Sequence, residues 1–555
     1  MSPLDSSSTA GAGPAPVQSS DAIIVGAGFS GLYQLHRLRG LGLTARVIEA
    51  GRGVGGTWYW NRYPGARCDV ESMQYSFSFS EELQQSWRWS ERFSGQPEIL
   101  RYANHVADRF DLRRDIEFDT RVTAMNFDEA AGQWRVTTDR GGRYTARYGI
   151  MATGCLSTAR KPDFKGLDSF KGRTFHTGYW PHDPVSFKGE RVAVIGTGSS
   201  AIQAIPVIAA EAAHLTVFQR TPNYSIPTRN EPMPAHYEQA WKTDYARRRA
   251  EARTTKNGIV TEFSEHAALE LAETARQSVY EARWATGGTT FMQAFKDLVT
   301  DKAANDTAAE FVRNKIRQTV RDPAVAELLA PKDYPIGTKR ICVDSHYYDT
   351  YNRSNVTLID VKSNPIEAIT PAGVQVAGQI TAVDSIVYAT GFDAMTGTLA
   401  RIDIRGRRGE SLKDKWEAGP RTYLGLMSAG FPNLFMITAP GSPSVLSNMM
   451  VSIEQHVDWT TNAIAHLQRQ RLDVIEPTED AEADWVAHNN EVAHKTLYPR
   501  AASWYMGANI PGKPRVFLPY IGGVGVYREK CDAIAALGYQ GFTLTAVRAT
   551  AEAGE

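Results

Sequence analysis

The chain has 555 residues, of which 42% are hydrophobic and 22% are charged, and Lys and Arg balance Asp and Glu at 61 each. This composition excludes a mostly disordered, collagen-like or disulfide-scaffold chain, and zero net charge gives no reason to expect nucleic acid or an anionic membrane as a partner. The mean hydropathy of -0.35, without an apolar run of about 18 residues, predicts a soluble protein.

The four cysteines and the N-terminal residues indicate the compartment. No two cysteines form a C-x-x-C pair or a zinc-ribbon spacing, so neither a dithiol nor a metal site is expected. Residues 1–20 are rich in Ser, Ala, Gly and Pro and lack the apolar core of a signal peptide. We therefore expect a disordered tail and a cytoplasmic protein, either a monomer or a weak homo-oligomer.

A strand, a glycine turn, a helix with leucines on one side and a second strand follow over residues 22–49. This order is typical of a nucleotide-binding β-α-β unit, whose turn has the pattern G-x-G-x-x-G. Glu49 ends the second strand, where a carboxylate can bind both hydroxyls of a ribose. The turn is expected to bind a dinucleotide through Gly26, Gly28, Phe29, Ser30 and Gly31.

The same order of elements returns over residues 191–219. Arg220 stands where the first unit has Glu49, and Thr221 follows it. A carboxylate would repel a 2′-phosphate, whereas a guanidinium and a hydroxyl would bind it. The second site is therefore assigned to NADP(H) and, by exclusion, the first to FAD. The second turn consists of Gly196, Thr197, Gly198, Ser199, Ser200 and Ala201.

The predicted fold is α/β, with two Rossmann-like dinucleotide-binding domains and a helical insertion in the NADP domain. The insertion is inferred from helical spacing and missing strand signals. Since a disulfide reductase would need a cysteine pair, O₂ is the expected electron acceptor. The expected order is a tail (1–20), the FAD domain (21–155), the NADP domain (156–230), the insertion (231–330), the second part of the NADP domain (331–390), the second part of the FAD domain (391–545) and a tail (546–555).

A signature lies just before the second β-α-β unit. Phe170, Gly172, His176, Trp180 and Pro181 match F-x-G-x-x-x-H-x-x-x-W-[PD]. The match resembles the signature of type I Baeyer–Villiger monooxygenases, whereas related amine and sulfide monooxygenases usually carry Tyr in place of Trp. We interpret the segment as a hinge whose histidine forms hydrogen bonds across a linker.

Three further segments (55–69, 334–340 and 503–513) are similar to the phenylacetone and steroid monooxygenase branch. The resemblance implies conversion of a ketone to an ester or lactone with O₂ and NADPH, through a flavin C(4a)-peroxide. An amine or sulfide monooxygenase and a catalytically silent flavoprotein remain alternatives. Spacing does not indicate whether the ketone is aryl, cyclic or steroid-like.

The resemblance also implies roles for single residues. Arg340 would be the catalytic cation that stabilises negative oxygen, and Asp69 would orient it. Lys339 would join the second site at the 2′-phosphate. The remaining implied contacts are Thr57, Trp58, Tyr59, Trp60, Asp69, Tyr75, Val122 and Met449 for FAD, Arg67, Arg340 and Trp504 for NADP, and Ser444, Val445 and Leu446 for the ketone pocket.

Overall fold

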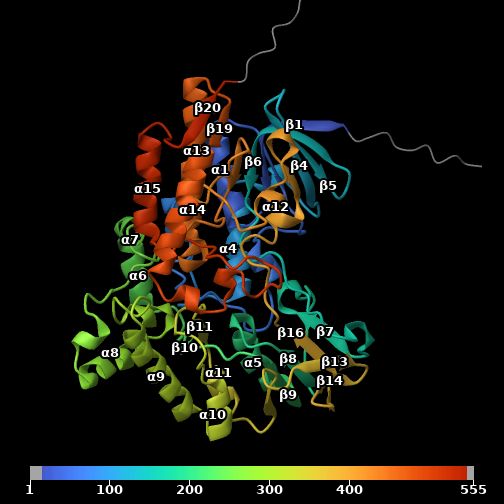
Figure 1. Ribbon diagram of the computed structural model, residues 1–555, viewed down its shortest axis with the longest axis vertical. Coiled ribbons are helices and arrows are strands. Elements are labelled where there is room, and N and C mark those ends of the chain that lie inside the picture. Colours follow the sequence, from blue (N-terminus) through green and yellow to red (C-terminus); the bar gives the residue numbers. More distant parts are fainter. Residues whose placement is uncertain (1–15, 547–555) are drawn as a thin grey trace, which may run out of the picture.

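The computed structural model describes residues 16–546 and contains two separate large sheets (Figure 1). In the first sheet the order is β17-β4-β5-β6-β1-β2-β3, and β18 also pairs with β6. Successive residues of β1 are buried on opposite faces of the sheet. Ala22 and Ile24 face a core that includes helices, and Ile23 and Val25 face a second core that includes residues of β4, β5 and the segment 399–416. The strands are β1 (Val17–Val25), β2 (Ala45–Ile48), β3 (Ile116–Glu117), β4 (Val122–Asp128), β5 (Gln133–Thr138), β6 (Arg143–Met151), β17 (Asp403–Arg405) and β18 (Leu434–Met436).

The first strand corrects the predicted N-terminal tail. β1 starts at Val17, and its residues from Val17 to Ser20 pair in parallel with Arg143 to Ala146 of β6. This stretch is polar and largely exposed, so backbone hydrogen bonds hold it and no apolar pattern marks it in the sequence. Residues 1–15 and 547–555, which make up most of the predicted tails, lie outside the described residues.

The second sheet is entirely parallel, in the order β12-β9-β8-β16-β7. The connection β8–α5–β9 repeats the connection β1–α1–β2 of the first sheet, which confirms the predicted fold with two dinucleotide-binding units. The strand β7 lies at the edge of this sheet and contains the signature histidine. The first half of the signature segment therefore forms an edge strand. The elements are β7 (Arg173–His176), β8 (Arg191–Ile195), α5 (Ser199–Glu211), β9 (His214–Gln219), β12 (Val356–Asp360), β16 (Ser385–Tyr388) and α1 (Phe29–Gly40).

Residues 231–330, all of them described, contain five α-helices and no named strand. Asp301 and Asp322 begin two of these helices by accepting hydrogen bonds from Ala304 N and Ala324 N, each over 2.8 Å. The five helices are α6 (Ala235–Thr243), α7 (Tyr245–Ala252), α8 (Glu273–Thr286), α9 (Lys302–Thr319) and α10 (Pro323–Leu329). In Figure 1, α8, α9 and α10 lie beside the second sheet, whereas α6 and α7 lie higher, below α15 (Val524–Ala536). Trp241 of α6 and Tyr245 of α7 belong to the hydrophobic core of the first unit, so this part of the predicted insertion packs on the FAD domain and not on the NADP domain.

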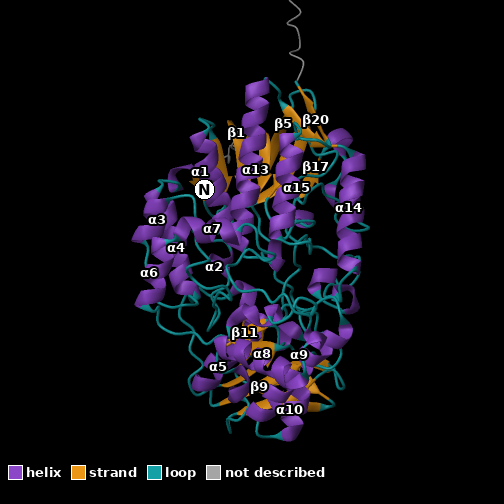
Figure 2. Cartoon of the chain, turned by 90° about the vertical axis from the view of Figure 1, so that its left-hand side faces the viewer, coloured by secondary structure: helices purple, strands orange, loops and turns teal. Residues whose placement is uncertain are grey.

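The C-terminal third returns to the first sheet. It supplies β17 and β18, and its long helix α13 (Met449–Gln470) packs against α1. Figure 2 shows the two sheets in opposite halves of the molecule, with a loop-rich middle between them. The other helices are α2 (Thr57–Trp60), α3 (Glu81–Ser86), α4 (Gln96–Arg109), α11 (Tyr347–Thr350), α12 (Leu412–Lys415), α14 (Glu479–His494) and α15 (Val524–Ala536).

Three small sheets complete the described part. They are formed by β10–β11, β13–β14–β15 and β19–β20. Within residues 16–546, no helix combines the length and apolar character that a membrane crossing requires. The strands of these sheets are β10 (Ser225–Pro227), β11 (Cys342–Asp344), β13 (Ile366–Thr370), β14 (Gly373–Val376), β15 (Gln379–Ala382), β19 (Val474–Pro477) and β20 (Phe542–Thr545).

Candidate active site

The first glycine turn joins β1 to α1 so closely that side chains are excluded. Gly26 has φ +106°, and a Cβ there would lie 2.7 Å from the carbonyl oxygen of Ala152. A Cβ on Gly31 would lie 1.9 Å from the carbonyl oxygen of Gly26. Gly28 precedes α1 and faces Gly56, whose own Cβ would come within 2.8 Å of Gly28 Cα. The backbone amides at the start of α1 are thus left open to a ligand, as a pyrophosphate requires.

Glu49 holds this turn in place. Its two carboxylate oxygens accept hydrogen bonds from Ala27 N and Gly51 N, both over 2.6 Å. Burial raises the pKa of this carboxyl group, and the two backbone donors partly offset the effect. The same side chain lines the cleft beside the turn, so structural support and a ribose contact are compatible.

The second turn repeats the geometry of the first. Gly196 has φ +112°, and a Cβ there would lie 2.5 Å from the carbonyl oxygen of Ala389. A Cβ on Gly198 would have no described heavy atom within 4 Å, which leaves space at the start of α5. Thr197 Oγ1 donates to the carbonyl oxygen of Thr221 over 2.8 Å and ties the turn to the end of β9.

Three cationic side chains gather near this end of β9. Lys339 lies with its Nζ 4.5 Å from the centre of the Tyr334 ring, and burial together with the nearby charge of Arg220 lowers its pKa. The structure therefore places Lys339 near Arg220. Arg160, which the sequence did not single out, is the third: burial and Arg220 lower its pKa as well. Such a cluster suits a dianionic phosphate.

A cleft of about 540 Å³ lies beside the first turn and reaches α5 of the second unit. It is lined from both dinucleotide-binding units, as expected of a path that brings two cofactors together. The predicted residues that line it are Gly26, Gly28, Phe29, Ser30, Glu49, Thr57, Trp58, Trp60, Arg67, Asp69, Tyr75, Val122, Ser199, Arg340, Val445, Met449 and Trp504.

Tyr59 is placed outside this cleft, contrary to the prediction. Its ring lies against Gly51 and Gly53, and its hydroxyl accepts a hydrogen bond from Arg52 N over 3.0 Å. Because α2 is a single turn, its four side chains point in different directions and only three of them reach the cleft. The other predicted cofactor residues outside the cleft belong to the close-packed part of the first turn or to the second site: Gly31, Gly196, Thr197, Gly198, Ser200, Ala201, Arg220, Thr221 and Lys339.

The predicted pair of Arg340 and Asp69 is formed. Arg340 Nε donates to Asp69 Oδ2 over 2.9 Å, and Arg340 Nη1 donates to the carbonyl oxygen of Val445 over 2.8 Å. Asp69 is the largest cause of a raised pKa of Arg340, which keeps the guanidinium charged. The two side chains are 32% and 21% exposed, so both still face open space.

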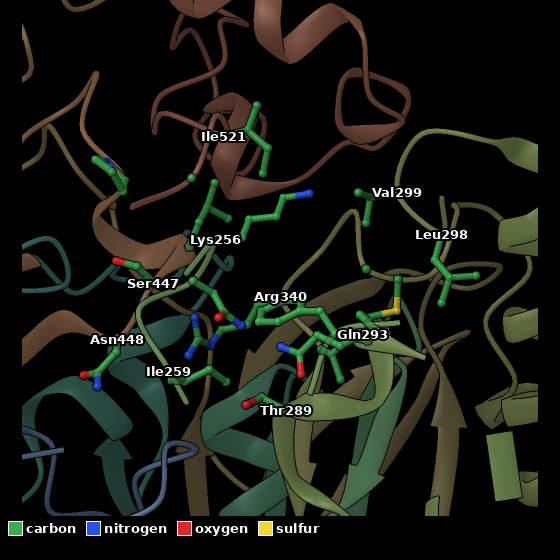
Figure 3. A pocket seen from close by; sticks show the side chains of 18 of the residues that line it. Lys256, Ile259, Thr289, Gln293, Leu298, Val299, Arg340, Ser447, Asn448 and Ile521 are labelled. Atoms are coloured by element: carbon green, nitrogen blue, oxygen red, sulfur yellow. The ribbon is translucent and has the colours of Figure 1, made fainter. Parts of the chain in front are cut away.

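A second cavity, of about 470 Å³, meets the cleft at Arg340 (Figure 3). It is lined by the insertion, by the loop before α13 and by the segment before α15. Val445 and Leu446 line it as predicted. Ser444 does not: it is fully buried, and its hydroxyl donates to the carbonyl oxygen of Thr438 over 3.1 Å. The short helical turn at 444–446 directs Ser444 into the protein and its neighbours toward the cavity.

The signature histidine forms hydrogen bonds across the linker. His176 Nδ1 accepts from Gly178 N over 3.0 Å, which leaves the proton on Nε2 to be donated to the carbonyl oxygen of Arg160 over 3.0 Å. Thr390 Oγ1 lies 3.1 Å from the same nitrogen. Burial lowers the pKa of His176, so the ring is neutral near pH 7.

The other signature residues are packed against neighbouring groups, except for Pro181. Trp180 is buried and stacks on Phe175, with ring centres 5.2 Å apart. A Cβ on Gly172 would lie 2.3 Å from the carbonyl oxygen of Asp384 and 2.6 Å from the Phe170 ring. Pro181 is exposed. The five signature residues, all described, lie outside the lining of the cleft and of the cavity: Phe170, Gly172, His176, Trp180 and Pro181.

Two side chains of the site were missed by sequence reasoning. Gln203 on α5 donates to the carbonyl oxygen of Arg67 over 3.0 Å and accepts from Tyr63 over 2.9 Å. Tyr505 lines the second cavity and contributes to the raised pKa of Arg340. Neither carries a sequence signal of its own, since each acts only through a residue distant in the chain.

A comparison with family models matches residues 23–305 to the pyridine nucleotide-disulphide oxidoreductase family. All four cysteines lie within the described residues, and each is buried and free. The match therefore rests on the dinucleotide-binding units, and no disulfide supports the chemistry that the family description mentions.

Curated relatives and solved structures match over almost the whole chain. A Baeyer–Villiger monooxygenase of Pseudooceanicola batsensis is 43% identical over 94% of this chain and 95% of its own. A phenazine N-monooxygenase of Lysobacter antibioticus is 41% identical over 94% and 96%. A steroid monooxygenase solved with NADP is 54% identical, with a TM-score of 0.92 over 95% of this chain and 100% of that one. On sequence, fold and site, this chain belongs to the type I Baeyer–Villiger monooxygenases, NADPH-dependent flavin enzymes.

Proposed function

We propose that this chain converts a ketone, O₂, NADPH and a proton into an ester or lactone, water and NADP⁺, with FAD as the bound cofactor. One observation carries the proposal: Arg340, held by Asp69 and Val445, lies where the cofactor cleft meets the second cavity. A fixed cation at that junction faces both the cofactor and a ketone.

The residues present fit both cofactors. For FAD, the first turn leaves amides free beside a 540 Å³ cleft, and Glu49 stands at its ribose end. For NADP(H), Gly198 opens space at α5, and Arg220 and Lys339 supply the charge for the 2′-phosphate. Bound FAD, once reduced by NADPH, supplies the chemistry that activates O₂. We assign the cofactor contacts to the predicted residues that line the cleft and the second turn.

The protein's own contribution to the reaction centres on Arg340. Its guanidinium is preorganised by two hydrogen bonds, so it can stabilise negative charge on the ketone oxygen without reorganising when that charge develops. Asp69 fixes the orientation of the guanidinium and maintains its positive charge. Apolar side chains in the lining of the second cavity lower the local polarity and so strengthen this electrostatic effect.

Oxidation of an amine or sulfide is the second candidate function, favoured by the similarity to the phenazine N-monooxygenase. The test supplies the purified FAD-loaded protein and NADPH with one aryl, one cyclic and one steroid ketone, and with an aromatic amine and a sulfide. We expect NADPH consumption coupled to products heavier by one oxygen atom with at least one ketone. Oxidation of the amine or sulfide alone would contradict the proposal.

A further inference from the structure

Lys256 is the feature of the second cavity that the proposed reaction leaves unused. It lies between α7 and the insertion's second half and belongs to the cavity lining that also contains Arg340. Figure 3 shows its side chain extending into the cavity. The Lys256 side chain is exposed to the cavity. The surrounding protein lowers its pKa, because it removes part of the water around the ammonium group.

The backbone around Lys256 is fixed from two sides. Its carbonyl oxygen accepts a hydrogen bond from Val524 N over 2.9 Å, at the start of α15. The carbonyl oxygen of the next residue, Asn257, accepts from Asn448 N over 2.8 Å, at the start of α13. The Lys256 stem also packs on Gly523, where a Cβ would lie 3.3 Å from Lys256 Cγ. The lysine is therefore held on a rigid part of the wall.

The ammonium group has no protein partner. Among residues 16–546, no side chain or backbone oxygen forms a hydrogen bond or ion pair with Lys256 Nζ, and desolvation is the single cause of its pKa shift. The other charged groups of the lining are differently placed: Asp69 neutralises Arg340, Lys296 lies 3.8 Å from Glu270, and Glu265 forms no ion pair with Lys256. Lys256 is therefore a cation in the cavity lining that is free to pair with an anionic group of a ligand.

The lining of the cavity that holds the two cations is mixed, and its apolar part is the larger. Ile259, Val299, Val445 and Ile521 all line the cavity that contains Arg340 and Lys256. A ligand that spans it would have a polar group at each end and hydrocarbon between them. Its volume, about 470 Å³, is within the range of small-molecule sites.

We propose that the substrate is an oxo acid: a ketone whose carbonyl lies at Arg340 and whose carboxylate, separated by a hydrocarbon spacer, pairs with Lys256. This inference rests on the proposed function, because it assigns the far end of the same substrate. Lys256 contacts the substrate away from the reacting atoms and so determines specificity.

The test compares a series of methyl-ketone acids (5-oxohexanoic, 7-oxooctanoic and 9-oxodecanoic acid) with their methyl esters as substrates of the FAD-loaded enzyme. Wild type should prefer the acid of fitting length. Lys256→Met should lower kcat/KM for that acid roughly 10- to 100-fold, as expected for a lost charge-assisted hydrogen bond, and change the ester about two-fold at most. Lys256→Arg should retain most of the preference.

Lys302→Met is the matched control, since Lys302 pairs with Asp306 on the surface of α9 and should leave both substrates unaffected. Calorimetry with decanoate and decanamide measures binding without turnover; decanoate should bind wild type and Lys256→Arg more tightly than Lys256→Met or Lys256→Gln. If the enzyme oxygenates each keto acid and its methyl ester equally well, and Lys256→Met changes neither rate, this inference is wrong and the proposed function still stands. Failure to oxygenate any ketone would instead contradict the proposed function.

Discussion

Replacement of Arg340 by alanine is the most direct test of the site. The substitution removes the hydrogen bonds to Asp69 and to the Val445 carbonyl oxygen and leaves a carboxylate without its cation. Breaking a fully buried pair costs about 3–5 kcal/mol of stability. Since about a third of the Arg340 side chain (32%) is exposed, solvent should reduce this cost to about 1–2 kcal/mol, and the protein should remain folded.

The effect on catalysis should be larger than the effect on folding. Loss of one preorganised donor typically lowers kcat by 10²–10³, on the order of 2.7–4 kcal/mol. FAD binding should persist, because the first glycine turn and Glu49 do not contact Arg340. Ester formation should fall at least 100-fold, and NADPH oxidation should release hydrogen peroxide instead.

The assay measures NADPH consumption, hydrogen peroxide and ester in the same reaction. Arg340→Lys is the control, because it retains the charge but cannot donate to Asp69 and Val445 with the same geometry. Asp69→Ala should show a milder loss, since Arg340 keeps its charge and loses its orientation. Ester formation by Arg340→Ala at nearly the wild-type rate would refute the role given to this residue.

Three further predictions address the second site, the signature and the core. Arg220→Ala should raise KM for NADPH roughly 10-fold or more and leave KM for NADH nearly unchanged, and equal effects on both would exclude a 2′-phosphate contact. His176→Ala should slow turnover or uncouple NADPH use without removing a limb of the pH profile, because the neutral ring joins the linker to Arg160 and Thr390; loss of one limb with intact flavin reduction would make it a proton-transfer group. Burial lowers the pKa of His456 to about 3, and its Nδ1 accepts from Thr438 N over 2.9 Å. Since this folded-state pKa lies below the unfolded value of about 6.5, stability falls as the pH decreases through this window, and His456→Asn should flatten that dependence by up to about 1.4 kcal/mol per pH unit in acid unfolding curves.

The parts of the site that the sequence predicts well are those whose physical reason is local. Gly26 and Gly196 have a positive φ, and a Cβ at either position would lie within 2.7 Å of a carbonyl oxygen. Because glycine meets both requirements, each turn appears in the sequence as a short glycine motif. The Arg340–Asp69 pair joins residues 271 positions apart, and no spacing rule connects them. Family resemblance indicated that pair, and the structure supplies its geometry.

The errors have a common cause, which is that residue type and spacing do not give side-chain direction. Tyr59 lies among three residues that reach the cleft, and Ser444 beside two that reach the cavity. Each belongs to a helical turn of three or four residues, too short for a periodic pattern to show which side faces the ligand. The N-terminal part of β1 was missed for a related reason: backbone pairing with β6 stabilises it whatever its side chains are.

The role of Lys256 could not be predicted from the sequence for the same reason. In the sequence it is one cation in a helical, charge-rich insertion, where other lysines, such as Lys302, have an acidic neighbour one helical turn away. The role of Lys256 depends on the lining of the second cavity, which comes from residues near 256, 299, 445 and 521. Arg340 therefore lies in a segment that family resemblance identifies, whereas Lys256 lies in an insertion without a motif, and the wall around it also comes from two distant segments. Only the folded chain shows that the two cations share one cavity, and this is why the specificity proposed for Lys256 could not be predicted from the sequence.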